Sequence, residues 1–215
     1  MLFPKRCPSC GVLGRAPCGE CARTLRRATG TVSVAGLASC RPVFVYDEAV
    51  RTLLLALKYR NRRDALGYLA GEIAGLVDID ADIVTWVPTT AARRRARGFD
   101  QAELLARGVG RRIGVPVRSL LQRVDDRPQT GRDAQARRVG PEFSVRRGRR
   151  AASTVLLIDD IGTTGATLQA AARTLTLGGW REIHARPAAW TPRRASGSGP
   201  PGAVTGAKSG HLWAN

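Results

Sequence analysis

The sequence predicts an α/β protein built on a mostly parallel sheet flanked by helices, with a small cysteine-rich module at its N-terminus. β-branched apolar runs alternate with helical patterns, which predicts the sheet. The first 29 residues carry four cysteines and too little apolar surface for a core, which predicts the module. We therefore divide the chain into a metal-binding module (1–29), an α/β domain (30–190) and a disordered tail (191–215) that is rich in Gly, Pro, Ser and Ala.

The sequence of the first half of the domain predicts a strand, two helices and a second strand. A short β-branched run at 43–46 predicts the first strand. Apolar residues at helical spacing predict helices at 48–59 and 64–76, the second beginning on Asp64 as an N-cap. A second run at 83–87, followed by a proline, is typical of a buried strand, and we expect an arginine-rich loop after it.

A third helix and a long polar stretch follow that loop. Asp100 and Glu103 form a capping-box pattern and predict a helix that ends near Gly114. A short strand is expected at 115–117. Residues 120–150 are polar, rich in arginine and weakly periodic, which predicts a mobile loop with local helix.

The strongest strand signal lies at 154–158. It leads through a loop of small and hydroxyl residues into a helix at 166–177, which two glycines end. A last strand is expected at 182–189. Because strands alternate with helices throughout, the sheet is predicted to be mostly parallel.

The loop after the strongest strand has the chemistry of a ligand site. The strand delivers Asp159 and Asp160 to its C-terminal end, where open α/β sheets bind their ligands. Small residues let the backbone N–H groups of the loop approach a ligand closely, and a helix N-terminus favours an anion. Two carboxylates would repel that anion, so we expect them to face hydroxyls or a metal ion. A sugar phosphate satisfies both requirements.

The alternative for this segment is an ordinary strand-to-helix turn capped by Thr164. Two adjacent acids after an apolar strand disfavour it, because each is costly to bury without a partner. We therefore interpret the segment as a ligand-binding loop.

Cys7, Cys10, Cys18 and Cys21 form two Cys-x2-Cys pairs separated by seven residues. Four thiolates at this spacing suit a tetrahedral zinc ion, which would stabilise a segment too short for a core of its own. We expect a structural site, because four thiolates leave no open coordination position. A redox dithiol pair is the alternative, and Cys40 is expected to be a small buried residue.

The chain is strongly basic, with a formal net charge of +18. This charge predicts attraction to polyanions, either nucleic acid or phosphorylated metabolites, and a solvated basic surface is the alternative. The sequence contains no apolar run of about 18 residues, so no membrane span is expected. Its N-terminus does not have the pattern of a signal peptide, and we expect a cytoplasmic location.

The segment 155–167 resembles the phosphoribosyl pyrophosphate (PRPP) signature of type I phosphoribosyltransferases. The resemblance implies the type I phosphoribosyltransferase fold. It implies that Asp159 and Asp160 hold the ribose hydroxyls and serve catalysis, and that Mg²⁺ arrives with PRPP. The remaining PRPP-binding residues that it implies are Gly162, Thr163, Thr164, Gly165, Ala166 and Thr167.

Residues 97–101, Arg-Gly-Phe-Asp-Gln, resemble a pattern of the ComF family, and so does the strand before them, although Trp86 replaces its first proline. The loop corresponds to the pyrophosphate side of the fold, which implies that Arg95 and Arg97 contact pyrophosphate. A solvated basic loop is the alternative, and we prefer it for Arg94. ComF-like proteins also carry a zinc-ribbon-like module in the N-terminal position.

A third block of the resemblance covers the region of the flexible catalytic loop. The chain departs from the family pattern there, since Gly140 stands where Asn is usual and Arg132 where Leu is usual. The residues that fit are Arg123, Gln129, Arg137 and Phe143.

The resemblance implies two alternative functions. The first is a glycosyltransferase that moves phosphoribosyl from PRPP to a nitrogen nucleophile and releases pyrophosphate, with an acceptor that the sequence does not identify. The second is a non-catalytic module of DNA uptake in natural transformation, which binds single-stranded DNA or a helicase partner. Aromatic residues make up 5% of the chain, which disfavours a base-stacking platform. Proteins of this fold often dimerise, so a homodimer is a further expectation.

Overall fold

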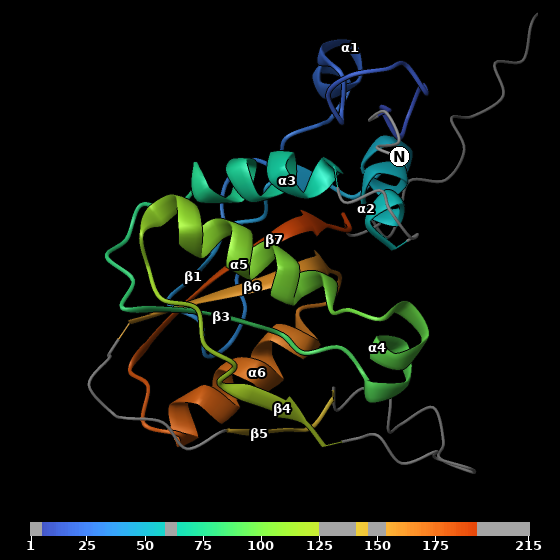
Figure 1. Cartoon of the computed structure of the whole chain (residues 1–215). Coiled ribbons are helices and arrows are strands. Elements are labelled where there is room, and N and C mark those ends of the chain that lie inside the picture. The colour runs from blue at the N-terminus through green and yellow to red at the C-terminus, as the bar shows by residue number, and fades with distance from the viewer. Residues whose placement is uncertain (1–5, 59–63, 125–140, 146–153, 193–215) are drawn as a thin grey trace, which may run out of the picture.

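A computed structural model gives the fold and describes residues 6–58, 64–124, 141–145 and 154–192. Its centre is a five-stranded sheet in the order β1-β7-β6-β3, with β2 also paired to β7 (Figure 1). Every pairing in this sheet is parallel. Its strands are β1 (Ser39–Cys40), β2 (Phe44–Val45), β3 (Ile83–Trp86), β6 (Thr154–Gly162) and β7 (Glu182–Trp190).

Helices cover both faces of the sheet (Figure 1). Three lie on one face: α2 (Glu48–Lys58), α3 (Asp64–Ala74) and α5 (Gln101–Ile113). On the other face lie α6 (Ala166–Leu177) and a two-stranded antiparallel ribbon of β4 (Leu121–Arg123) and β5 (Phe143–Val145). This arrangement confirms the predicted mostly parallel sheet with flanking helices.

The central strand β6 contributes side chains to both hydrophobic cores, one on each face of the sheet. Leu156 and Ile158 belong to the cluster packed with α2, α3 and α5, while Val155 and Leu157 belong to the cluster packed with α6. All four side chains are fully buried. A strand buried on both faces reads as a continuous apolar run, which is why this segment gave the strongest strand signal.

The helices at 48–59, 64–76, 100–114 and 166–177 are confirmed to within about two residues, a normal uncertainty at helix ends. α5 begins after Asp100, whose carboxylate accepts hydrogen bonds from Ala102 N and Glu103 N. It ends at Gly114, which adopts a left-handed conformation with φ of 72°. The strand expected at 115–117 is reduced to one parallel bridge, between Val117 and Val84.

Three expectations for local structure were wrong. The arginine-rich loop after β3 contains a helix, α4 (Ala91–Arg97), which Thr90 caps through its Oγ1 and Gly98 ends with φ of 77°. The strand expected at 154–158 continues to Gly162, because β7 pairs with it beyond the two acids. The stretch at 120–150 contains β4 and β5, and its residues 125–140 and 146–150 lie outside the described ranges.

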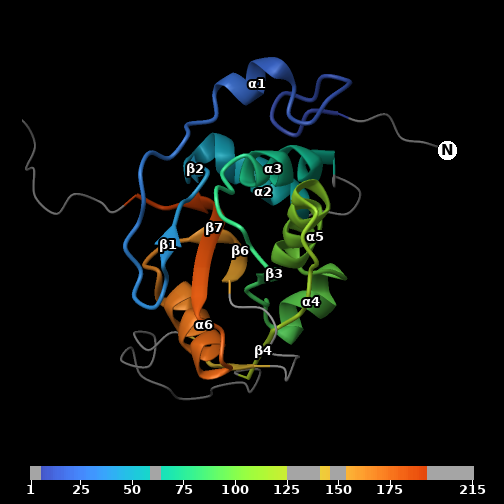
Figure 2. The ribbon, with the colours of Figure 1, turned by 90° about the vertical axis from the view of Figure 1, so that its left-hand side faces the viewer.

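The N-terminal module sits over the α2–α3 layer and contains the short helix α1 (Gly19–Arg23) (Figure 2). Its connection to the domain is hydrogen-bonded to β2, with Ala28 N donating to Val43 O at 2.9 Å and Val45 N donating to Arg26 O at 2.9 Å. Leu25 is buried in the domain core. The module is therefore tied to the sheet through the chain that leaves it, and residues 193–215 of the predicted tail lie outside the described ranges.

Within the described ranges, no helix has the length and apolar character needed to span a bilayer.

Gly110 in α5 packs against the segment that follows the helix. A Cβ there would lie 2.3 Å from Val117 Cγ2 and 2.8 Å from the Val115 carbonyl oxygen, which are distances that real contacts do not reach. Gly110→Ala is expected to lower the free energy of unfolding by about 1–2 kcal/mol, measured by denaturant unfolding. The matched control is Gly67→Ala in α3, where the nearest atom would be Arg112 Nη2 at 3.7 Å, and it should raise stability by up to about 1 kcal/mol. Equal effects of the two substitutions would contradict the packing argument.

Candidate functional site

A cavity of about 320 Å³ opens at the carboxyl ends of β3 and β6, beside α4 and the start of α5. Open parallel sheets bind ligands at this edge, so the location agrees with the general rule. The lining residues are mostly polar and include both signs of charge. They are Val87, Pro88, Thr89, Arg93, Arg97, Asp100, Gln101, Ala102, Arg123, Asp159, Asp160, Ile161, Thr163 and Thr167.

Three carboxylates face this cavity from two elements. Asp159 and Asp160 come from the end of β6, and Asp100 caps α5. Asp159 Oδ1 accepts a hydrogen bond from Asp160 N at 2.8 Å, and Asp160 Oδ1 accepts one from Ile161 N at 2.8 Å. These local bonds fix the two side chains of β6. Each acid keeps acceptor capacity beyond them, because a carboxylate offers about four lone-pair sites.

Burial and mutual repulsion change the proton affinity of this group. Burial, followed by the charges of Asp160 and Asp100, raises the pKa of Asp159 well above its usual value. Burial also raises the pKa of Asp100, although the N–H groups of Thr89, Glu103 and Ala102 oppose that shift. The Asp159 side chain is only 7% exposed, so its ionised form lacks the solvation that it has in water. A cation or hydroxyl donors in the cavity would favour that ionised form.

The loop between β6 and α6 brings hydroxyls to the same cavity. Thr163 and Thr167 line it, whereas Gly162, Thr164, Gly165 and Ala166 do not. Gly165 is the N-cap of α6 with φ of 84°, and Thr164 Oγ1 accepts a hydrogen bond from Ala166 N at 3.3 Å. The N-terminus of a twelve-residue helix therefore lies beside the cavity, and its partial positive charge favours an anion there.

Gly162 makes a close contact that only glycine permits. A Cβ at this position would lie 2.1 Å from Trp190 Cε3, so the indole of the last β7 residue packs directly against the loop backbone. Thr191 N also donates to Gly162 O at 2.9 Å. The loop that follows the acids is therefore supported from β7.

Arginines reach the cavity from α4 and from β4. Arg93 and Arg97 are one helical turn apart and both line it, whereas Arg95 is exposed and is not among the lining residues. Arg123 of β4 also lines it, with its guanidinium 5.8 Å from the centroid of the Phe143 ring. Gln129, Arg132, Arg137 and Gly140 lie outside the described ranges.

Sequence reasoning did not single out Arg93, Asp100 or Gln101 as site residues. The helix α4 was not predicted from the sequence. Arg93 and Arg97 lie on the same side of this segment, at positions i and i+4, only when the segment is helical. Thr90 followed by two alanines was the available signal, since threonine is a favoured N-cap and alanine is the best helix former.

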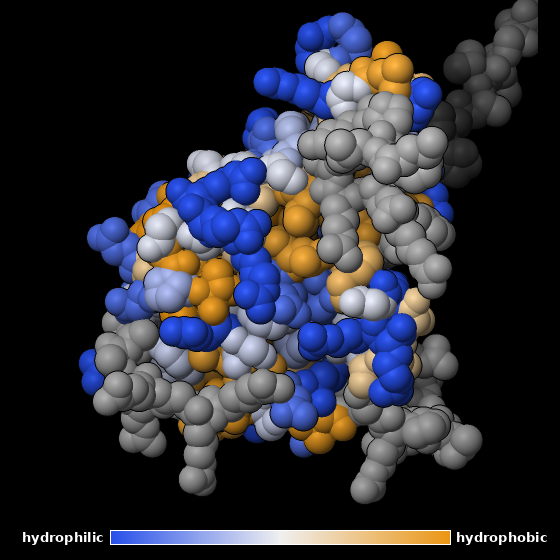
Figure 3. Space-filling view, viewed as in Figure 1, coloured by the Kyte–Doolittle hydropathy of each residue, from blue (hydrophilic) through white to orange (hydrophobic). Residues whose placement is uncertain are grey.

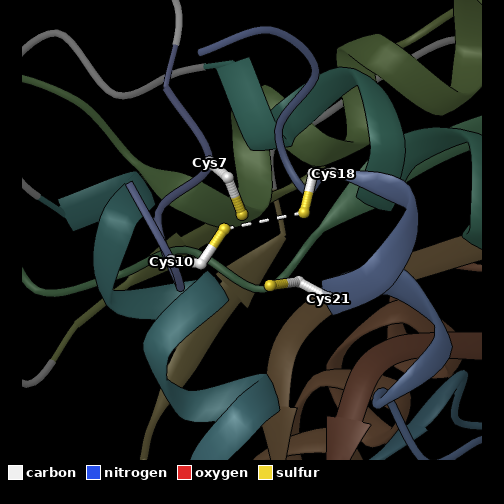
Figure 4. A group of neighbouring side chains, drawn as sticks. All are labelled: Cys7, Cys10, Cys18 and Cys21. Carbon is white, nitrogen blue, oxygen red and sulfur yellow. Dashed lines mark hydrogen bonds between the residues drawn. The ribbon is translucent and has the colours of Figure 1, made fainter. Parts of the chain in front are cut away.

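The four cysteines of the module come together as predicted (Figure 4). Their Sγ atoms all lie within 4.8 Å of one another, and Cys10 Sγ and Cys18 Sγ are 3.6 Å apart. Four sulfurs at zinc–sulfur distances of about 2.3 Å in a tetrahedron would be about 3.8 Å apart, so the spacing fits one metal ion. The cluster could hold such an ion without a change of fold, and all four cysteines are free thiols.

Thiols of this cluster differ in pKa, because ionisation of one of them disfavours ionisation of its neighbours. Burial raises the pKa of Cys7, but the N–H groups of Cys18, Cys10 and Ser9 more than offset it and lower that pKa to about 6. The thiols of Cys18 and Cys10 raise the pKa of Cys21 to about 12. A bound dication would stabilise all the thiolates together, which is what a four-sulfur site requires.

Comparison with curated proteins gives two relatives. The chain is 27% identical over 176 residues to the competence protein ComFC of Bacillus subtilis (strain 168), covering 79% of this chain and 70% of the relative. It is 24% identical over 186 residues to the competence protein ComFC of Streptococcus pneumoniae (strain ATCC BAA-255 / R6), covering 83% of this chain and 78% of that one. The chain is similar to ComFC over most of its length. The predicted ComF resemblance is thereby confirmed, although no protein-family model matches the sequence.

Solved structures that resemble this chain include a PRPP amidotransferase and a purine phosphoribosyltransferase. The glutamine PRPP amidotransferase from B. subtilis, complexed with ADP and GMP, gives a TM-score of 0.45 at 19% identity and matches 63% of this chain. The chain spans 30% of that protein's length. The purine phosphoribosyltransferase from Pyrococcus horikoshii Ot3 gives a TM-score of 0.28 at 14% identity, over 70% of this chain and 85% of the other.

Asp159→Asn is expected to stabilise the ligand-free protein at pH 7 by about 1 kcal/mol, because the amide removes a buried carboxylate whose ionised form is disfavoured. The pKa of Asp159 is raised, so the unfolded chain releases this proton at a lower pH than the folded protein. The contribution of Asp159 to stability is therefore full below its ordinary pKa of about 4 and declines as pH rises through the raised value.

Thermal unfolding at several pH values checks this expectation. The difference between Asp159→Asn and the wild type should widen from pH 4 upward, while the exposed control Asp80→Asn should show no such trend. A constant difference across the pH range would contradict the role assigned to burial of Asp159.

Proposed function

We propose that the cavity binds PRPP with Mg²⁺, or a related ribose 5-phosphate ligand, and that the protein transfers phosphoribosyl to a nitrogen nucleophile with release of pyrophosphate. One observation carries this proposal. Buried carboxylates, arginines and the N-terminus of a helix border a single cavity at the carboxyl edge of a parallel sheet. A ligand that has a diol and two separate anionic groups matches this combination.

Each part of the ligand has a counterpart among the residues. Asp159 and Asp160 accept hydrogen bonds from the ribose hydroxyls, which would supply the partners that a buried carboxylate needs. Thr163 and Thr167, with the loop backbone between them, take the 5′-phosphate at the start of α6. Arg97 and Arg93 of α4, with Arg123 of β4, take the pyrophosphate.

The reaction follows from this charge distribution. The bond between the anomeric carbon and the pyrophosphate oxygen breaks, and its electron pair leaves with pyrophosphate. The nitrogen of the acceptor forms the new bond to carbon and loses its proton to solvent. The guanidiniums stabilise the charge that develops on the leaving group, while the carboxylates hold the ribose in place as positive charge grows on the ring. Mg²⁺ bound with the ligand would neutralise part of the pyrophosphate charge.

We further propose that the four cysteines of the module bind one structural zinc ion. The sulfur spacing and the all-thiolate donor set support zinc over a harder cation. Four sulfur ligands fill its coordination sphere, so the ion would hold the module together and would not activate water.

A second candidate function is contact with nucleic acid during DNA uptake. Both relatives are named competence proteins. Both α4 and α5 also carry exposed arginines, and the face seen in Figure 3 shows hydrophilic patches among apolar ones. Such a surface would bind phosphates in a strongly salt-dependent way. The exposed arginines of these two helices are Arg93, Arg94, Arg95, Arg107, Arg111 and Arg112.

The zinc proposal predicts one zinc ion per chain, measured by elemental analysis of the purified protein. Cys18→Ala is expected to lose the metal and to unfold the module, because three thiolates bind far more weakly than four. Cys40→Ala is the matched control, since Cys40 lies buried in the domain core, and it should keep a full equivalent of zinc. Loss of metal from both variants alike would contradict the assignment.

The PRPP proposal predicts saturable binding of PRPP with Mg²⁺ by the zinc-loaded wild type, measured by calorimetric titration. The double variant Asp159→Asn/Asp160→Asn should bind at least about tenfold more weakly, because hydrogen bonds to charged groups contribute about 1.5–3 kcal/mol each. Asp80→Asn, an exposed acid before β3 at the other edge of the sheet, should bind like the wild type. A folded wild type that binds neither PRPP nor ribose 5-phosphate would overturn the proposal and favour the nucleic-acid function.

A further inference from the structure

Gln101 is an almost fully buried polar side chain that links the cavity to the helix layer. It is the first residue of α5 and only 3% exposed. Its Nε2 donates to the backbone carbonyl of Leu54 in α2 at 3.2 Å. Its Oε1 accepts from Arg97 Nη1 at 3.2 Å. The side chain therefore joins a cavity arginine to a helix that does not line the cavity.

The polarity of these two contacts allows one orientation of the amide. A backbone carbonyl only accepts hydrogen bonds and a guanidinium only donates them. Rotating the amide by half a turn would set its NH₂ against the Arg97 donors and its oxygen against the Leu54 oxygen, and both contacts would be lost. The Leu54 carbonyl thus fixes the amide, and the amide oxygen then fixes one edge of the guanidinium.

The backbone around Gln101 is held just as firmly. The neighbouring Asp100 accepts hydrogen bonds from Thr89 N at 2.8 Å and from Ala102 N at 3.0 Å, which ties the start of α5 to the chain that leaves β3. On the other side, Gly98 ends α4 in the left-handed conformation. Arg97 and Gln101 are therefore presented by two helix ends whose relative position is fixed.

Arg97 differs in this respect from the second arginine of α4 that lines the cavity. The Arg93 side chain is exposed, and within the described ranges no hydrogen bond or ion pair holds its guanidinium. Arg97 is half-buried and anchored through one nitrogen. A guanidinium has five donors, so this anchor leaves a fork of donors for an anion. Ordering a long side chain before binding removes part of the entropy cost of binding.

We propose that Gln101 is a positioning residue that presets the Arg97 guanidinium for the pyrophosphate group of the ligand. This inference rests on the proposed function and deepens it, because it assigns the pyrophosphate-binding geometry to a residue that need not touch the ligand. The positioning role predicts a selective effect on ligand affinity. Loss of the amide should weaken binding of ligands that carry pyrophosphate and should spare ligands that lack it.

The test compares two ligands on the full zinc-loaded chain by calorimetric titration: PRPP with Mg²⁺, and ribose 5-phosphate, which has the same sugar phosphate without pyrophosphate. Gln101→Met keeps the length and packing of the side chain but removes both hydrogen bonds. It should weaken PRPP binding about tenfold, within the range for loss of a hydrogen bond to a charged group, and leave ribose 5-phosphate within twofold of the wild type. The matched control is Gln169→Leu on the exposed face of α6, which should change neither affinity.

A second arm repeats Gln101→Met in an Arg97→Ala background. If the amide acts through Arg97, its loss there should change PRPP affinity by less than twofold. Should Gln101→Met fail to fold, Gln101→Asn replaces it, since that amide is one methylene too short to reach both partners and should give the same selective loss.

The possible results separate the inference from the proposed function. Equal losses for both ligands, no loss for either, or an undiminished loss of PRPP affinity in the Arg97→Ala background would overturn the positioning role and leave the proposed function standing. A wild type that binds neither ligand would overturn the proposed function, and the positioning role would fall with it.

Discussion

The burial of the Asp159 carboxylate beside that of Asp160, near the end of β6, is the constraint on which the rest of the structure depends. β6 is paired on both sides and covered on both faces, so its C-terminal end cannot shift to bring Asp159 into bulk water. The raised pKa of Asp159 shows that this position disfavours the ionised form of its carboxyl group. The fold therefore places a carboxylate whose ionised form is unfavourable where hydroxyl donors of a ligand, or a cation, would stabilise that form. The surrounding elements supply arginines that could bind the anionic groups of such a ligand.

Those positive groups are held with different degrees of order. Arg97 is fixed by a buried amide, Arg123 lies near an aromatic ring, and Arg93 extends from the exposed face of a short helix. A chain with a net charge of +18 has many arginines that could reach an anion, so composition alone does not select among them. The arginine that is selected is the one with a local anchor. The Arg-Gly-Phe-Asp-Gln segment carries four of the residues involved: the arginine, the glycine that ends α4, and the buried aspartate and glutamine at the start of α5.

The parts of the fold that could be predicted are those in which local chemistry and tertiary packing agree. The apolar run before Asp159, the glycines and threonines after it, and the spacing of the four cysteines each fix a structure within a few residues. α4 could not be found in the same way, because its four arginines have no apolar periodicity and its caps decide the structure. The strand β2 lies within the run predicted at 43–46. The two-residue strand β1 was not predicted, because it exists only through its pairing with β7 and so short a segment has no periodicity to detect.

The contact between Gly162 and Trp190 has a consequence for how the sequence can change over time. The indole fills the space in which any larger residue at 162 would place its Cβ, and it also lies 3.5 Å from the Cβ position of Gly165. The two strand ends are thus complementary in shape, and a gain of volume in the loop requires a matching loss at the end of β7. Positions 162 and 190 should therefore covary among homologues of this protein. Where alanine replaces the glycine at 162, a smaller side chain should replace the tryptophan at 190.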